Sequence, residues 1–521
     1  MAPAVIISEA LPTKDASKQR SSPHKLTCGG RMRYNIILNA LIVGLVASPF
    51  FIPTIATLAI NSYFAFLWVC FLILATITQC KIRSTLQHYN KLQIKTPTPE
   101  AEGDHVTVLD ESKSLKKIMV TFAYKEPLEL IVETLENVSK LSQASSVILG
   151  ISLEQRTPEK DKKIAEISRR FENCFAQLII TVHPYGTEGE IPGKCSNFNY
   201  ALRSIVSHIR AKDPKFDPKD YIVTNFDIDS RFHPRFLEIQ QDTCLQEKDP
   251  YSTVWQPVLF YNWNLDKLSF ITRMTGLNRN ILMMGALIPF NINVMSVYTA
   301  SLQLFIQGNY THPAYQMEDI ICYIRWMLMT KRVLKIKPIY CPTISAPTSG
   351  NSVIQETVEW AKQLRRWTIG SAEVFHYFCI KARRINFFYA ITWGLNYVNY
   401  YGFFMIAQGL LTVTTTIYLF VIERHSPDSL QIWFTIPLGV VYFSLLMVII
   451  INKIAVKTFL KQVEVDEKIP IWKDFFLWIV SPFIFIAYNI VALVGLFEAV
   501  FHGKKVCTHD ASKKDALVNV V

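Results

Sequence analysis

Long apolar runs near both ends of the chain constrain its fold more than any other feature. Residues 35–53 and 56–78 are each close to the ~20 residues that a helix needs to cross a bilayer, and more apolar sequence follows residue 385. Hydrophobic residues make up 50% of the 521 residues, and the excess lies mainly in these two regions. The pattern predicts a membrane protein with a water-soluble middle.

Basic residues indicate which ends of the first two runs face the cytosol. Arg31 and Arg33 precede the first run. Lys81 and Arg83 follow the second, and no charged residue lies between the runs. Because Lys and Arg concentrate on the cytoplasmic side, we expect residues 33–80 to form a transmembrane hairpin with both ends, and hence the soluble domain, in the cytosol.

Charge and cysteine usage narrow the class of protein further. The net charge is +12, but many basic residues lie beside apolar spans, where they meet anionic lipid, so a nucleic-acid partner is not expected. The ten cysteines lack CxxC or metal-finger spacing, which favours a reducing compartment.

Composition divides the chain into seven parts. Residues 1–32 are expected to be a disordered cytosolic tail, because they are polar and lack apolar periodicity. After the hairpin, the expected parts are a linker at 81–115, a soluble domain at 116–350, amphipathic interface helices at 351–401, C-terminal transmembrane helices at 402–501 and a tail at 502–521.

The number of C-terminal spans is left open by the sequence. Crossings at about 402–422, 433–451 and 475–500 give five in all and an outward C-terminus. Lysines in the tail that follows, including Lys504 and Lys505, would prefer the cytosol. A second crossing hidden in residues 385–422 would remove the conflict.

Strand and helix patterns alternate through the soluble domain. Apolar runs at residues 117–123, 147–153 and 177–182 resemble buried strands, and amphipathic segments separate them. This alternation predicts an α/β fold whose mostly parallel sheet carries helices on both faces and is flanked by transmembrane helices.

A further apolar run, residues 221–226, ends in two carboxylates, Asp227 and Asp229. Acidic side chains at the carboxyl end of a parallel strand open into the crevice where such sheets bind ligands. Two carboxylates can hold Mg²⁺ together with the phosphates of a substrate. Such a pair also occurs by chance in loops.

Three other segments carry chemically useful groups. Lys194 ends a Gly-rich loop at a helix entrance and could meet phosphate, or it could be a solvated loop lysine. Glu318 and Asp319 could equally be an exposed pair in the first turn of a helix. In the segment from Gln363 to Trp367, Arg and Trp could instead be interfacial residues.

In this order the motifs resemble glycosyltransferase family 2, in particular its membrane-embedded branch with cellulose, chitin and hyaluronan synthases and ceramide glucosyltransferase. The resemblance covers residues 117–367. Its elements are Ala123-Tyr124-Lys125-Glu126, Gly193-Lys194, Asp227-x-Asp229, Glu318-Asp319 and the Gln-x-x-Arg-Trp of Gln363, Arg366 and Trp367. Where the family has an aspartate that contacts the nucleotide base, the candidate in this chain is Glu154.

The resemblance implies a GT-A-like fold and a UDP- or GDP-sugar donor, with Mg²⁺ or Mn²⁺ held by Asp227 and Asp229. It implies that Asp319 is the general base of an inverting transfer and that Glu318 positions Asp319 or the acceptor. The residues implied to bind the nucleotide-sugar are Ala123, Tyr124, Glu126, Glu154, Lys194, Asp227, Gln363, Arg366 and Trp367.

Three functions follow as hypotheses. The first is a processive polysaccharide synthase that exports its product through its own helices, along polar and aromatic residues that include Asn396, Tyr397, Asn399, Tyr400 and Gln408. The second transfers one sugar to a membrane lipid. The third is a channel or receptor with an inactive domain. The sequence identifies neither the sugar, nor plasma membrane as against Golgi, nor the oligomeric state.

Overall fold

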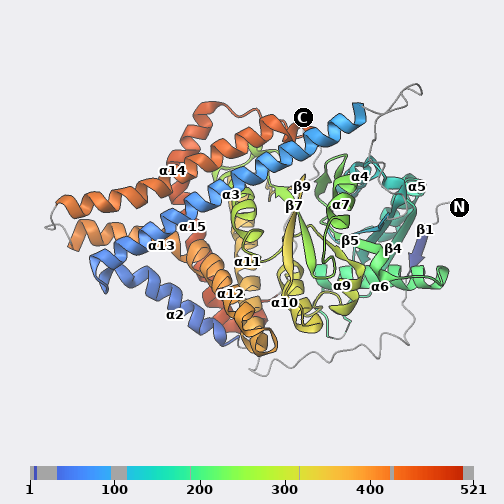
Figure 1. Ribbon diagram of the computed structural model, residues 1–521, viewed down its shortest axis with the longest axis horizontal. Helices are drawn as coiled ribbons and strands as arrows, with labels where there is room; N and C mark the ends of the chain where they lie inside the picture. The colour runs from blue at the N-terminus through green and yellow to red at the C-terminus, as the bar shows by residue number, and fades with distance from the viewer. Residues whose placement is uncertain are drawn as a thin grey trace.

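The computed structural model describes residues 5–8, 32–94, 114–187, 189–315, 317–422 and 428–507. A sheet with its covering helices forms one side of the molecule, and long helices form the other, as Figure 1 shows on the right and the left. The two parts correspond to the soluble middle and the apolar ends of the sequence.

Within the described residues the sheet has nine strands in the order β1-β4-β3-β2-β5-β8-β7-β9-β6. The neighbours β1, β4, β3, β2 and β5 pair in parallel, and so do β7 and β9. Strand β8 pairs antiparallel with both β5 and β7, and β6 pairs antiparallel with β9. The strands are β1 Val5–Ser8, β2 Lys116–Ala123, β3 Val147–Glu154, β4 Gln177–His183, β5 Tyr221–Asn225, β6 Ser230–Phe232, β7 Thr253–Phe260, β8 Tyr298–Ser301 and β9 Lys335–Ser345.

The described part of the soluble domain has eight α-helices, of which the last packs mainly on other helices rather than on the sheet. The eight are α4 Leu128–Ser139, α5 Lys160–Phe171, α6 Lys194–Lys212, α7 Phe236–Leu245, α8 Phe270–Leu282, α9 Leu302–Gln307, α10 Glu318–Thr330 and α11 Val353–Lys381. In α4 the apolar residues Ile131, Leu135 and Val138 recur at helical spacing, and all three are fully buried. The expected fold class, α/β with a mostly parallel sheet beside long apolar helices, is confirmed.

Four of the described helical segments are long and apolar enough to cross a membrane: Thr54–Lys91, Phe387–Val421, Ile432–Thr458 and Ile471–Val506. They correspond to α3 Thr54–Ile94, to α12 Phe387–Tyr397 with the continuous turns η8 Val398–Ala407, α13 Gln408–Ile417 and η9 Tyr418–Ile422, to α14 Asp428–Thr458 and to α15 Ile471–His502. The first expected span is shorter, because α2 Tyr34–Ala47 continues only to Phe50.

The structure differs from the expected division of the chain in three places. Helix α3 continues without a break to Ile94, inside the expected linker, because Ile82 and Leu86 recur at helical spacing and are buried. Residues 95–113 of that linker lie outside the described residues. Residues 387–401, expected to be a separate interfacial segment, begin the long helix that runs to Ile422.

The third difference concerns the N-terminal segment that was expected to be disordered. Val5–Ser8 forms β1 and pairs in parallel with β4 from Leu178 to Thr181. Val5, Ile6 and Ile7 are β-branched residues, which favour strands, and this preference explains why the segment adds a strand beside β4. Residues 1–4 and 9–31 lie outside the described residues.

Buried polar contacts join the soluble domain to the membrane helices. Asp474 of α15 forms ion pairs with Arg273 of α8 and Lys453 of α14. Beside them, Asn280 donates hydrogen bonds to Asn262 at 2.7 Å and to Asn452 at 2.6 Å. Because a buried polar group without a partner is costly, these contacts fix how α8, α14 and α15 meet.

The end of α15 also contacts the soluble domain. Lys504 lies 2.6 Å from the Glu373 carboxylate and donates a hydrogen bond of 2.9 Å to the carbonyl of Ala314. These contacts place Lys504, one of the lysines whose side was left open above, beside the soluble domain.

We expect Asp474→Ala to lower the melting temperature of the purified protein in detergent. The substitution leaves the buried Arg273 guanidinium without its carboxylate, a change that typically costs about 3–5 kcal/mol. Asp466→Ala is the matched control, because its pair with Lys468 is exposed. Equal melting temperatures for the two variants would contradict this role.

Candidate functional site

The two aspartates lie in the turn that follows β5, at the carboxyl end of a central strand. The Ser230 N–H donates a hydrogen bond of 3.0 Å to the Asp227 carbonyl and closes the turn. Thr134 of α4 donates a hydrogen bond to the carbonyl of Ile228, which fixes the turn against the neighbouring helix. Asp229 is buried, whereas the Asp227 side chain is 22% exposed and faces a cavity.

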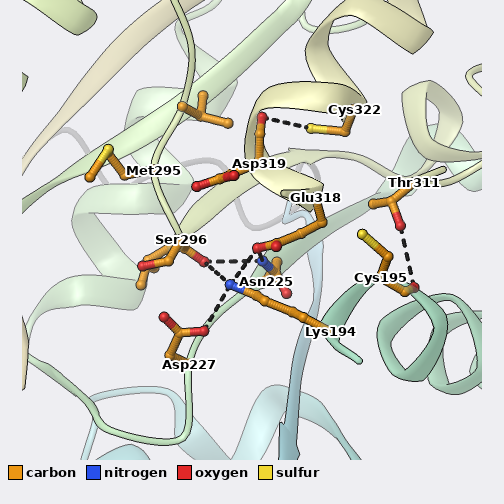
Figure 2. A network of polar contacts seen from close by, with 12 residues as sticks. Lys194, Cys195, Asn225, Asp227, Met295, Ser296, Thr311, Glu318, Asp319 and Cys322 are labelled. Carbon is orange, nitrogen blue, oxygen red and sulfur yellow. Dashed lines mark hydrogen bonds and ion pairs between the residues drawn. The ribbon is translucent and has the colours of Figure 1, made fainter. Parts of the chain in front are cut away.

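Lys194 is the centre of the charged network in Figure 2. Its ammonium lies 2.8 Å from Asp227, forms an ion pair with Glu318 and donates a hydrogen bond of 3.3 Å to the carbonyl of Ser296. Burial disfavours the charged lysine, but Asp227, Glu318 and Asp319 outweigh it and raise the pKa of Lys194. The ammonium therefore stays charged. The alternative that Lys194 is a solvated loop lysine is wrong, because its side chain is buried.

The loop before α6 explains how a lysine reaches this position. Helix α6 begins at Lys194 itself, directly after the Gly-rich loop. Gly193 precedes it with φ 149°, a conformation that side chains other than glycine rarely adopt. The Ser196 hydroxyl donates to the Gly193 carbonyl at 3.0 Å and stabilises this entry into the helix.

Glu318 and Asp319 occupy the first turn of α10, and both are buried rather than exposed. Asn225, the last residue of β5, donates a hydrogen bond of 3.0 Å to the Ser296 carbonyl and a weaker one of 3.5 Å to Glu318. Burial raises the pKa of Glu318 and of Asp319, although Lys194 acts in the opposite direction on each. Two adjacent carboxyls with raised pKa values in a cavity are typical of functional sites.

One cavity of about 240 Å³ joins these groups to α11. Ten of the residues that the sequence singled out line it: Glu126, Lys194, Asp227, Asp229, Glu318, Asp319, Gln363, Arg366, Trp367 and Tyr400. Residues far apart in the sequence therefore meet at the carboxyl ends of the central strands, where open α/β sheets bind ligands.

Consecutive residues of α11 point in different directions. Arg365 donates a hydrogen bond of 2.5 Å to Glu498 of α15, while Arg366 and Trp367 line the cavity. Gln363 also lines it and accepts a hydrogen bond of 2.6 Å from Thr348. One face of α11 therefore forms part of the cavity wall, and another face contacts α15.

Arg279 of α8 is a cavity residue that the sequence did not reveal. Its guanidinium lies 3.6 Å from the ring centroid of Trp367 and 4.8 Å from that of Tyr261. Burial lowers the pKa of Arg279, but an arginine remains charged. Its neighbours are rings rather than carboxylates, so it adds a positive charge to the cavity. Nothing in the local sequence distinguishes this arginine from a surface residue.

Aromatic residues from the membrane helices complete the cavity. Tyr400 and Tyr401 of η8 and Tyr488 of α15 line the side opposite the sheet. Of these, Tyr400 was expected to line a sugar path, and the other two were not identified from the sequence. Only the packing of the membrane helices against the soluble domain brings them to the site.

Three of the expected nucleotide-sugar residues do not line this cavity. Ala123 is buried at the end of β2, and the backbone N–H of Tyr124 donates to the Glu126 carboxylate at 2.7 Å. Glu154 forms an ion pair with Arg156 and lines a separate small hollow at the ends of β3 and β4. The cavity lined by Asp227 and Asp319 and the hollow at the end of β3 are thus different places in the fold.

The residues in the cavity fit a hard divalent cation. Among the described residues no group of three or more His, Cys, Asp or Glu side chains is arranged to hold a metal ion. Asp227 and Asp229 nevertheless place two carboxylates in the same cavity, and Mg²⁺ commonly uses one or two carboxylates plus substrate phosphates. The donor set therefore suits an ion that arrives with a phosphorylated ligand.

Similar solved structures include several glycosyltransferases, although no protein-family model and no curated protein matches the chain. The mannosyltransferase PcManGT from Pyrobaculum calidifontis, in complex with GDP-Man and Mn²⁺, is 12% identical with a TM-score of 0.41, and the match covers 83% of this chain and 99% of that one. S. aureus TarS 1–349 is 10% identical with a TM-score of 0.29, over 75% and 92%. Glucosyl-3-phosphoglycerate synthase from Mycobacterium tuberculosis is 13% identical with a TM-score of 0.28, over 52% and 84%.

Proposed function

We propose that this chain is an inverting glycosyltransferase that takes a sugar from a nucleotide-diphospho-sugar and transfers it to an acceptor hydroxyl at a membrane. The observation that carries the proposal is the shared cavity of Asp227, Asp229, Lys194, Asp319 and Arg366, which come from separate parts of the chain. Carboxylates, cations and a candidate base around one space are what this chemistry needs.

Asp319 is the proposed general base. Lys194 already forms an ion pair with Glu318, whereas the Asp319 carboxylate accepts a 2.9 Å hydrogen bond from the backbone N–H of Ile320. The acceptor oxygen attacks the anomeric carbon, the bond from that carbon to the phosphate oxygen breaks, and the acceptor proton moves to Asp319. Attack opposite the leaving group inverts the configuration. A raised pKa makes Asp319 a stronger base than an ordinary aspartate.

Positive charge for the leaving diphosphate comes from several directions. Arg366 and Arg279 line the cavity, and each guanidinium can donate two parallel hydrogen bonds to the oxygens of a phosphate. Lys194 contributes an ammonium. When bound at Asp227 and Asp229, Mg²⁺ or Mn²⁺ would neutralise part of the charge on the departing diphosphate. Preorganised charges of this kind usually contribute the largest share of a rate enhancement.

Trp367 is the proposed contact for the sugar of the acceptor or donor. Arg279 stacks on its ring and fixes the orientation of the indole. Flat rings of Tyr261, Tyr400 and Tyr488 lie in the same cavity. This aromatic lining suits the sugar of either acceptor that the sequence suggested, a growing polysaccharide or a membrane lipid.

An inactive channel or receptor is less well supported. Lys194, Glu318 and Asp319 are all buried in one cavity, and burying charges destabilises a protein unless they are used or paired. A buried Asp319 whose pKa is raised, in the same cavity as Lys194 and Glu318, suits catalysis better than structure. We place the reaction on the cytosolic face of the plasma membrane or the Golgi.

We expect Asp319→Asn to lower kcat by about 10²- to 10⁴-fold, because the amide cannot accept the acceptor proton. Release of UDP or GDP from a panel of nucleotide-sugars by the purified protein is the measurement. Asp161→Ala is the control, since that side chain is 92% exposed. Full activity of Asp319→Asn would rule out the assigned base.

The pH dependence of kcat should show the raised pKa of Asp319. The base works only when deprotonated, so activity is present above its pKa and is lost as the pH falls through it. We expect this loss clearly above the pKa of about 3.9 of an unperturbed aspartate. Melting temperatures at each pH separate it from unfolding. A profile flat down to about pH 4 would contradict the prediction.

Removal of the metal ligands should abolish metal-dependent nucleotide binding. We expect Asp229→Ala to weaken Mn²⁺ binding, measured by calorimetry with UDP or GDP present. Loss of a residue that only supports a metal ligand costs about 10- to 100-fold in metal affinity, and loss of a ligand should cost at least as much. Asp161→Ala again serves as control. Unchanged Mn²⁺ affinity would move the cation site away from Asp229.

A further inference from the structure

A second cavity lies among the membrane helices. It has a volume of about 130 Å³ and is enclosed by α3, η8 with α13, α14 and α15. Its walls are mainly apolar, with Trp68, Phe404, Leu445 and Phe485 among them. We call it the apolar crevice.

The apolar crevice adjoins the catalytic cavity. Met405 of η8 and Tyr488 of α15 line both spaces. These two residues form the junction, and Tyr400 and Tyr401 lie on its catalytic side. A molecule with a polar end and an apolar end could therefore occupy both spaces at once.

The backbone at the junction has an unusual form. Residues Val398–Ala407 form a stretch of π-helix, η8, within the otherwise α-helical segment. Such turns are rare and often occur at functional sites, because the wider turn shifts side chains around the helix. In this chain it presents both Tyr400 and Met405 to the cavities.

Two buried amides lie in the wall of the crevice. Asn489 donates a hydrogen bond of 2.6 Å to the Met405 carbonyl, while its side-chain oxygen has no hydrogen-bond partner among the described residues, and Gln408 is buried in the wall. Around Gly409 the helices α13 and α15 are close, since a Cβ there would lie 2.1 Å from the Asn489 side chain. Most of the remaining wall is apolar, which suits hydrocarbon better than a row of sugar hydroxyls.

Of the five residues expected to line a sugar path, Asn396, Tyr397 and Asn399 line neither cavity. Tyr397 is buried and donates a hydrogen bond of 2.9 Å to the Ser371 carbonyl. Asn396 donates to the Phe290 carbonyl at 3.2 Å. Tyr400 lines the catalytic cavity, and Gln408 faces the apolar crevice. The crevice beside the catalytic cavity is therefore lined mainly by apolar residues.

We infer that the acceptor is a hydroxyl-bearing membrane lipid whose hydrocarbon chain lies in the apolar crevice. The headgroup passes Met405 and Tyr488 and brings its hydroxyl to Asp319. This inference rests on the proposed function and specifies its acceptor. The lipid oxygen forms the new bond to the anomeric carbon, the carbon–phosphate oxygen bond breaks, the proton goes to Asp319 and the nucleoside diphosphate leaves. The product is a lipid that carries one sugar.

The test fills the crevice without touching the catalytic residues. Val441 of α14 is half-buried and lines the crevice, so Val441→Trp should occupy the space of the hydrocarbon chain. Met447→Trp is the matched control, because Met447 lies on the same helix, is 41% exposed and does not line the crevice. The full-length protein is used in phosphatidylcholine nanodiscs that contain a total membrane lipid extract.

Three measurements are made with labelled nucleotide-sugar: nucleoside diphosphate release, organic-soluble label and high-molecular-weight label. We expect organic-soluble product from the parent protein. Val441→Trp should raise the KM for the lipid extract at least about tenfold, which corresponds to the loss of about two buried methylenes, and leave nucleotide binding unchanged. Met447→Trp should match the parent protein.

The outcomes separate the two proposals. Nucleoside diphosphate release with only high-molecular-weight product, with only hydrolysis, or with lipid product that Val441→Trp does not change, overturns the lipid inference and leaves the proposed function intact. Absence of nucleoside diphosphate release from every nucleotide-sugar overturns the proposed function itself.

Discussion

The ammonium of Lys194 is the contact on which the rest of the site depends. It neutralises Asp227 and Glu318, two carboxylates that would otherwise repel each other in a buried space. The glycine-dependent entry to α6 brings it there. With this charge in place, the turn after β5 and the first turn of α10 can share one cavity.

The second constraint is the joint between the sheet domain and the membrane helices. Asp474 pairs with Arg273 and Lys453, and the amides of Asn262, Asn280 and Asn452 satisfy one another nearby. These contacts are directional, unlike the surrounding apolar packing, so they specify one arrangement of α8 against α14 and α15. That arrangement in turn brings Tyr400 and Tyr488 to the catalytic cavity.

Sequence predicts the parts of this structure that local patterns encode. The aspartate pair after a buried strand, the acidic start of α10 and the Gln-x-x-Arg-Trp of α11 all lie on one cavity, and the mostly parallel sheet follows from alternating strands and helices. Arg279 escapes prediction because only tertiary packing places it on Trp367. Glu154 was assigned by its place at a strand end, but the ion pair with Arg156 lies at another hollow. Helix α3 runs past its apolar run because polar residues propagate a helix that already exists.

The neighbouring arginines of α11 link the bilayer to the reaction. Arg365 is bound to Glu498 on a helix long enough to span the membrane, and Arg366, one residue later, faces the cavity. Under the proposed function, a tilt of α15, such as hydrophobic mismatch imposes in a bilayer of different thickness, would act through that ion pair on the residue next to Arg366. Membrane thickness would thereby become a physical variable of the proposed transfer, with no separate regulatory domain required.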